Sequence, residues 1–155
     1  MSGFACIFNL DLEDIEISSS DVEKILKPLS FRGKDKIKYL SKGPTSMMQC
    51  LFVATKEDSK EDLPSVHKDP NIMIVSDARL DNRDKLIKSL RIKDTTITDS
   101  EIIVQAYKLW SIDFCKHLIG PFAIIIYDFS KKKLMCFRDQ LGLRPLYYLS
   151  LIHIS

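Results

Sequence analysis

The apolar positions in the first third of the chain form one compact run and one helical pattern. Residues 4–10, FACIFNL, are apolar until the acidic segment DLEDIE begins, which predicts a buried strand followed by a solvated turn. In SSSDVEKILKPL, Ser20 and Glu23 have the spacing of a capping box, and apolar residues recur every three or four positions until Pro28. A short helix is therefore expected here.

Two β-rich runs follow, and a charged segment separates them. Residues 47–55, MMQCLFVAT, and residues 71–80, NIMIVSDARL, are rich in strand-forming residues. Residues 56–70, KEDSKEDLPSVHKDP, contain little to bury, so we expect an exposed loop between the two strands.

The second half of the chain alternates from helical to strand patterns. In residues 81–90, DNRDKLIKSL, the apolar positions share one helical face, and residues 98–110 begin with a second capping box, from Thr98 to Glu101. PFAIIIYDF and LMCF, joined by SKKK, predict a strand hairpin. Strands at both ends with helices between them favour an α+β layered sandwich over a doubly wound parallel sheet.

Composition limits the classes of partner and compartment. The 155 residues are 45% hydrophobic, which suits one domain, and 23 basic against 21 acidic residues give a net charge of +2. This balance predicts neither a nucleic-acid nor a membrane partner. With no span-length apolar segment and no signal peptide, a cytoplasmic protein is expected. The four scattered cysteines predict reduced thiols and no metal site.

The amino terminus, MSGFACIF, offers a candidate nucleophile. Removal of Met1, which a small second residue permits, would leave Ser2 with both a hydroxyl and a free amine, the layout of an N-terminal nucleophile. The alternative is an ordinary first strand whose opening residues are merely small. These eight residues leave both interpretations open.

Six segments in order carry a more specific signal. They are MSGFACIF, FRGKD (31–35), DARLDNRDKL (77–86), TDSEII (98–103), LIGPFAIIIYD (118–128) and RDQLGLRPLYY (138–148). Together they resemble the glutamine amidotransferase domain at the front of asparagine synthetases, enzymes of asparagine biosynthesis. The resemblance is closest to relatives such as β-lactam synthetases and the cyclases of lasso peptides.

The resemblance implies an architecture. The family's domain is a four-layer αββα sandwich of the N-terminal-nucleophile hydrolase type with antiparallel sheets, which here would cover residues 1–148. Residues 149–155 break the preceding pattern and are expected to be an irregular tail, and the sequence leaves open whether they are native. The resemblance also implies a C-terminal synthetase domain as partner, absent from this chain, which would use ATP and magnesium, whereas this fragment would hold no cofactor. A homodimer is a further expectation.

The resemblance also implies a glutamine pocket, and this sequence departs from it. Ser2 stands where active members have a cysteine nucleophile. The family's Asn-Gly-Glu-Ile-Tyr-Asn segment falls on residues 77–82. Asp77 and Ala78 replace its asparagine and glycine, and Arg79 replaces the glutamate that pairs with the substrate ammonium. Asp77 would accept hydrogen bonds where the family donates one to the developing oxyanion. Asp99 matches an acidic residue that helps to hold the glutamine amino group.

Several of these residues also have structural interpretations. Asp99 lies in the first turn of a predicted helix, where the helix dipole favours a carboxylate. Arg83 is expected to be exposed at a solvated helix start. In RDQLGLRPLYY we favour a structural role, in which Asp139 pairs with Arg138 or Arg144. The strand that should carry the arginine for the substrate carboxylate, residues 46–55, contains no arginine.

The sequence therefore predicts an amidotransferase-like domain of an ATP-dependent, amide-forming ligase of the asparagine synthase type, with glutamine hydrolysis lost. The nucleophile, the oxyanion donor and both substrate-binding charges depart from the family pattern together. The alternative is an active amidohydrolase that uses Ser2 on an amide other than glutamine.

Overall fold

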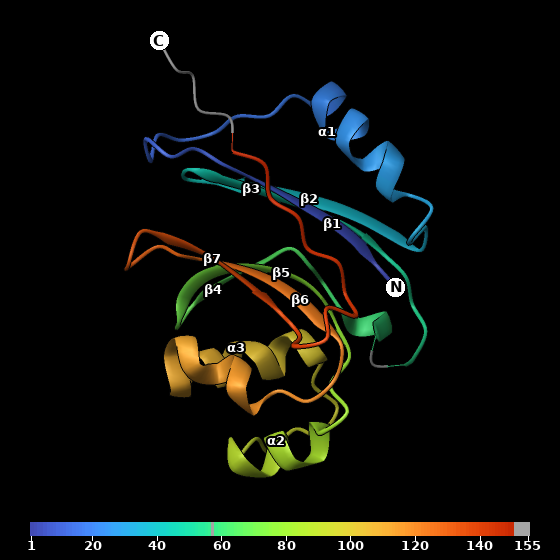
Figure 1. Cartoon of the computed structure of the whole chain (residues 1–155), viewed down its shortest axis with the longest axis vertical. Helices are drawn as coiled ribbons and strands as arrows, with labels where there is room; N and C mark the ends of the chain where they lie inside the picture. Colours follow the sequence, from blue (N-terminus) through green and yellow to red (C-terminus); the bar gives the residue numbers. More distant parts are fainter. Residues whose placement is uncertain (57, 151–155) are drawn as a thin grey trace.

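The structure is a computed structural model that describes residues 1–56 and 58–150. The strands are β1 (Gly3–Phe8), β2 (Lys36–Lys42), β3 (Thr45–Leu51), β4 (Ser65–Lys68), β5 (Asn71–Ala78), β6 (Phe122–Asp128) and β7 (Lys133–Arg138). The α-helices are α1 (Ser19–Leu26), α2 (Arg83–Ser89) and α3 (Asp99–Trp110), and the 3-10 helices are η1 (Lys27–Leu29), η2 (Asp58–Lys60) and η3 (Ser111–His117). Figure 1 shows two sheets stacked face to face, with α1 outside one sheet and α2 and α3 outside the other.

The first sheet has the order β1-β3-β2, and both pairings are antiparallel. Its central strand, β3, is buried along its whole length. Alternate β3 side chains point to opposite faces, so Met48 and Cys50 pack under Val22 and Leu26 of α1, while Met47 faces the second sheet. The start of β1 lies beside the end of β3, which pairs Gly3 with Cys50.

The second sheet has the order β4-β5-β6-β7 and is also antiparallel. Its outer face carries Ile72, Ile74 and Ile124, which pack against α2 and α3 in the largest apolar cluster. Its inner face contributes Met73, Val75, Ile125 and Tyr127 to the layer between the sheets, where they pack with Met47 of β3. Both faces of β6 are therefore covered, which agrees with its uninterrupted apolar sequence.

The α+β sandwich predicted from the sequence is confirmed by these two antiparallel sheets and their covering helices. The three predicted α-helices are present, and the capping box from Thr98 to Glu101 is formed in both directions. The first cap was assigned wrongly, because Ser18 and not Ser20 caps α1 by accepting the Asp21 N–H.

Two strands were missed. The expectation of an exposed loop over residues 56–70 is wrong, because this segment contains β4 and the buried residues Glu61 and Leu63. β2 carries lysines along an exposed edge of its sheet, so its sequence lacks the apolar run of a central strand. The expected tail at residues 149–155 falls mainly on residues 151–155, which lie outside the described part of the chain. Within the described residues, no helix is both long enough and apolar enough to cross a bilayer.

Candidate functional site

A cleft of about 640 Å³ opens where β1 begins, β5 ends and α3 begins. The sandwich brings these ends together although they are far apart in sequence. All five residues predicted for the glutamine pocket line this cleft: Ser2, Ala78, Asp77, Arg79 and Asp99. Their individual contacts, however, differ from those of a pocket open to an amino acid.

Ser2 is buried and lines the cleft. Its backbone N–H donates to Asp77 Oδ1 over 3.1 Å, and its Oγ accepts the Phe52 N–H over 3.0 Å. Met1 precedes it, so the nitrogen beside Asp77 is a peptide nitrogen in this structure. Among residues 1–56 and 58–150, the Ser2 hydroxyl has no carboxylate or imidazole as a hydrogen-bond partner.

Asp77 is held between Ser2 and Arg144. Its Oδ2 lies 3.3 Å from Arg144 Nε, and the two side chains are 11% and 15% exposed. Arg144 Nε is buried and donates no hydrogen bond within the described chain, so this contact is an ion pair without a well-aligned N–H. A carboxylate paired with a guanidinium is an acceptor only, and it places negative charge beside residue 2.

Ala78 and Arg79 form the adjoining wall. The Ala78 Cα is paired with that of Phe122 at the end of the β5–β6 ladder, and its side chain is partly buried. The Arg79 side chain is 67% exposed, and its Nε donates to Asp81 Oδ1 over 2.9 Å. Its charge is therefore already paired with that of Asp81.

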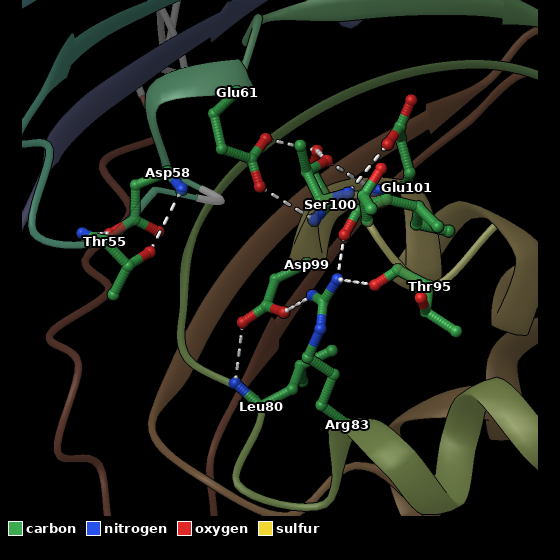
Figure 2. A network of polar contacts seen from close by, with 12 residues as sticks. Thr55, Asp58, Glu61, Leu80, Arg83, Thr95, Asp99, Ser100 and Glu101 are labelled. Atoms are coloured by element: carbon green, nitrogen blue, oxygen red, sulfur yellow. Dashed lines mark hydrogen bonds and ion pairs between the residues drawn. The ribbon is translucent and has the colours of Figure 1, made fainter.

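Asp99 is the first residue of α3, and both of its oxygens are used within the chain. Oδ2 accepts the Leu80 N–H over 2.9 Å, and Oδ1 accepts Arg83 Nη1 over 2.6 Å (Figure 2). Burial raises the pKa of Asp99, and the hydrogen bonds from Leu80 and Arg83 only partly oppose this effect. Asp99 thus joins the segment after β5 to α2 and α3, which gives it a structural role.

The expectation that Arg83 is exposed is wrong. Its side chain is 20% exposed and is turned toward Asp99 and the segment before α3. Asn82 occupies the N-cap position of α2, but its side chain makes no cap hydrogen bond. Its amide instead donates to His117 O at the end of η3 and accepts the Ile119 N–H. The partner of Arg83 is sixteen residues away, so no local pattern announces it.

Glu61 was missed by sequence reasoning because it lies in the segment expected to be an exposed loop. Its carboxylate accepts the Ser100 N–H over 3.0 Å and also the Ser100 hydroxyl, so it covers the start of α3 beside the capping box (Figure 2). Burial raises the pKa of Glu61, although the bonds from Ser100 favour its ionised form. A buried acid is tolerated here because the N–H groups at a helix start attract negative charge.

Asp139 was expected to pair with Arg138 or Arg144, and this is wrong. Its carboxylate accepts three backbone N–H groups, from Leu143 (2.9 Å), Arg144 (3.1 Å) and Phe122 (3.3 Å). These bonds fix the turn after β7, and the turn delivers the Arg144 side chain to Asp77. The sequence signal that was available is RDQLGLRP, where an acid precedes a Gly- and Pro-containing turn.

The arrangement can do less than its residues suggest individually. A serine hydroxyl at the nucleophile position needs a neutral base to take its proton. The oxyanion that forms during hydrolysis needs a hydrogen-bond donor. Here the nitrogen of Ser2 is hydrogen-bonded to Asp77, and Asp99 is bonded to Arg83. The carboxylates of Asp77 and Asp99 are therefore both paired with arginines of the same chain.

Comparison with known proteins identifies the domain family. Residues 1–154 match the family described as "Glutamine amidotransferase domain". The chain is 28% identical over 156 residues to asparagine synthetase [glutamine-hydrolyzing] 2 of Bacillus subtilis, which covers 99% of this chain and 21% of that protein. It is 29% identical over 101 residues to asparagine synthetase [glutamine-hydrolyzing] 3 of the same organism, covering 63% of this chain and 16% of that protein.

A shorter match belongs to a differently named relative. The chain is 35% identical over 66 residues to amidase chyE of Penicillium rubens, which covers 43% of this chain and 10% of that protein. The chain therefore spans about a fifth or less of the length of these relatives.

Proposed function

This chain belongs to the glutamine amidotransferase domain family. We propose that it is the amidotransferase-like part of an ATP-dependent, amide-forming ligase of the asparagine synthetase type. We also propose that it no longer hydrolyses glutamine. Such a ligase would join a carboxylate to an amine that its substrate already carries, and it would need no ammonia from glutamine. The domain would then be retained for its fold and for docking to the synthetase domain.

The observation that carries the proposal is the contact between Asp77 and the nitrogen of Ser2. If Met1 is removed, that nitrogen becomes an α-amine, whose ordinary pKa is near ~8. An amine 3.1 Å from a carboxylate is favoured in its ammonium form, which cannot take a proton from the Ser2 hydroxyl. If Met1 stays, the nitrogen is an amide and is no base at all.

The same carboxylate also opposes the charge that would develop during hydrolysis. A tetrahedral intermediate at Ser2 would carry an oxyanion, and Asp77 contributes a negative charge near it in place of a donor. Loss of one such donor alone typically lowers kcat by about 10²–10³ fold. The serine hydroxyl in place of a thiolate lowers the rate further.

The proposal assigns ATP and magnesium to the synthetase domain. We propose that a C-terminal synthetase domain holds both. A pyrophosphatase loop of the form SGG-x-DS downstream of this domain would support the proposal, and its absence would argue against the ligase.

Ammonia release tests the loss of glutamine hydrolysis. The purified wild-type domain and its Ser2→Ala variant are incubated with L-glutamine, and ammonia is measured by a coupled assay. We expect equal, background rates from the two proteins, because Ser2 has no usable base. A wild-type rate that falls to background in Ser2→Ala would overturn the proposal.

The wild-type protein also serves to test the alternative function. An amidohydrolase that uses Ser2 on another amide requires a chain that begins at Ser2. Intact mass measurement decides this point, since a retained Met1 excludes that mechanism.

A further inference from the structure

The edge strand β4 carries a serine beside a histidine. Ser65 and His67 are two positions apart, so their side chains point to the same face of the sheet. Ser65 Oγ lies 2.9 Å from His67 Nε2, within hydrogen-bonding distance. A hydroxyl bonded to an imidazole is the arrangement of nucleophile and base that serine hydrolases use. Neither residue is among the described residues that line the cleft around Ser2.

Burial does not explain this hydrogen bond. Ser65 and His67 are both partly exposed, so water can reach their polar atoms. Their partners on β5 are Ile74 and Ile72, and β4 is the outermost strand of its sheet. The bond is therefore not needed to keep a buried polar atom paired.

His67 also lines a groove of about 400 Å³ that lies beside the start of α3. One wall of the groove comes from α3, and another comes from the segment between α2 and α3. The apolar residues of these walls are Leu90, Ile92, Ile97 and Val104. The groove therefore offers an apolar group a place next to the imidazole.

Polar residues of the same groove limit the ligand further. Arg91 and Gln105 supply hydrogen-bond donors of the kind that stabilise an oxyanion. Asp94 and Glu101 also line the groove, and their carboxylates accept N–H groups of the turn before α3 and of its capping box. Two acids beside one arginine disfavour an anionic ligand, so the groove suits a neutral one.

His67 is in the form that accepts a proton. Burial lowers the pKa of His67, and the charge of Glu101 only partly opposes this effect. The charged residues that share the groove with the imidazole are Arg91, Asp94 and Glu101. The imidazole is therefore neutral at pH 7, and with its proton on Nδ1 it accepts the Ser65 hydroxyl at Nε2.

We propose that Ser65 and His67 form a hydrolytic site outside the cleft, which cleaves small neutral esters with an apolar acyl group. The Ser65 oxygen bonds to the ester carbonyl carbon, and His67 Nε2 takes the hydroxyl proton. The bond from that carbon to the alcohol oxygen breaks, and His67 gives the proton to the leaving alcohol. Water then cleaves the acyl-serine with His67 as base, which releases a carboxylic acid and restores the Ser65 hydroxyl.

Covalent labelling tests the nucleophile. The wild-type domain is incubated with an alkyl fluorophosphonate, and the intact mass and the labelled peptide are measured. We expect one adduct per chain, on the peptide that contains Ser65, and none at this place in Ser65→Ala. His67→Ala should slow the labelling by about 100-fold or more, because a positioned general base typically contributes about 10²–10⁴ fold.

Hydrolysis of p-nitrophenyl butyrate tests the activity. Ser65→Ala and His67→Ala should each lower the rate by about 100-fold or more. The wild-type rate should fall with decreasing pH, with a midpoint below 6.5, the ordinary pKa of histidine. His117→Gln is the matched control, since His117 is stacked on Trp110 at 3.9 Å and lies outside the groove, and it should keep the wild-type rate.

Two outcomes would overturn the second site: a wild-type domain that is not labelled on Ser65, or a His67→Ala variant that is labelled and hydrolyses the ester at the wild-type rate. Melting temperatures show whether each variant is folded. If one is not, the labelled peptide and the pH profile of the wild-type domain still decide the question. These measurements do not involve Ser2, so their failure leaves the proposed function unaffected.

Discussion

At the scale of single residues, one buried carboxylate arranges the contact on which the pocket depends. Asp139 accepts the N–H groups of Leu143 and Arg144, and it thereby holds the turn that sends Arg144 to Asp77. Burial by itself would raise the pKa of Asp139, but these N–H groups, together with that of Phe122, lower it below its usual range. The ionised form of Asp139 is therefore favoured in the folded protein.

Asp139→Asn tests this role. Replacement of the carboxylate removes charge-assisted hydrogen bonds, and we expect the free energy of unfolding at pH 7 to fall by roughly 2–3 kcal/mol, measured by urea denaturation. Because the pKa is depressed in the folded state, the stabilisation is complete above the unfolded value of about 4 and is lost as the pH falls through the folded value.

The gap in stability between wild type and Asp139→Asn should accordingly narrow below about pH 4. Asp14→Asn is the matched control, since Asp14 is exposed and should change stability by no more than about 0.5 kcal/mol. A gap that widens as the pH falls would contradict this account of Asp139.

At the scale of elements, the wall of the cleft is shaped by two loops that cross closely. The segment after β5 bonds the segment before β6 through Arg79 N–H to Pro121 O, over 2.9 Å, and Asp81 N–H to Ile119 O, over 2.8 Å. Gly120 lies between these bonds with a φ of +129°, and a Cβ at this position would lie 2.1 Å from the Arg79 carbonyl oxygen. Only glycine permits this approach.

Gly120→Ala should therefore destabilise the domain by at least roughly 2 kcal/mol, because backbone strain and a clash with another backbone act together. Gly43→Ala is the comparison: Gly43 has a φ of +58°, and its added Cβ would meet only the Phe129 ring at 3.6 Å. That variant should lose about 1 kcal/mol. The free energy of unfolding of both variants is measured by urea denaturation. Equal losses of this free energy would contradict the account of the loop crossing at Gly120.

At the scale of the whole molecule, the layers assemble a site from the two ends of the chain. Ser2 precedes β1 in one sheet, Asp77 lies near the end of β5 in the other, and Arg144 follows β7. Stacking of the sheets through the layer around Met47 and Met73 places these residues together. The paired charges in the cleft are thus a product of tertiary packing.

Much of this fold could be predicted from the sequence. Central strands such as β6 have long apolar runs, and α3 begins with a capping box, so local patterns specify them. β2 and β4 were not predicted, because an edge strand with lysines and a four-residue strand have no comparable pattern. Their pairing partners, not their own sequences, make them strands.

The site was predictable in position but not in its contacts. Ser2, Asp77 and Asp99, which the ordered motifs indicated, line one cleft. The partners of the two acids could not be predicted, because Arg144 and Arg83 reach them across 67 and 16 positions, from elements that local sequence does not orient. Local rules instead assigned Arg83 to solvent and Asp139 to a neighbouring arginine.

The most direct test of the central claim is covalent labelling at residue 2. The native domain is incubated with an electrophile that mimics glutamine, a diazoketone amino acid, and the intact mass and the N-terminal peptide are measured beside those of Ser2→Ala. The closed ion pairs around Asp77 and Asp99 predict that the mass of the wild-type domain stays unchanged. A stoichiometric adduct on Ser2, absent from Ser2→Ala, would contradict the account.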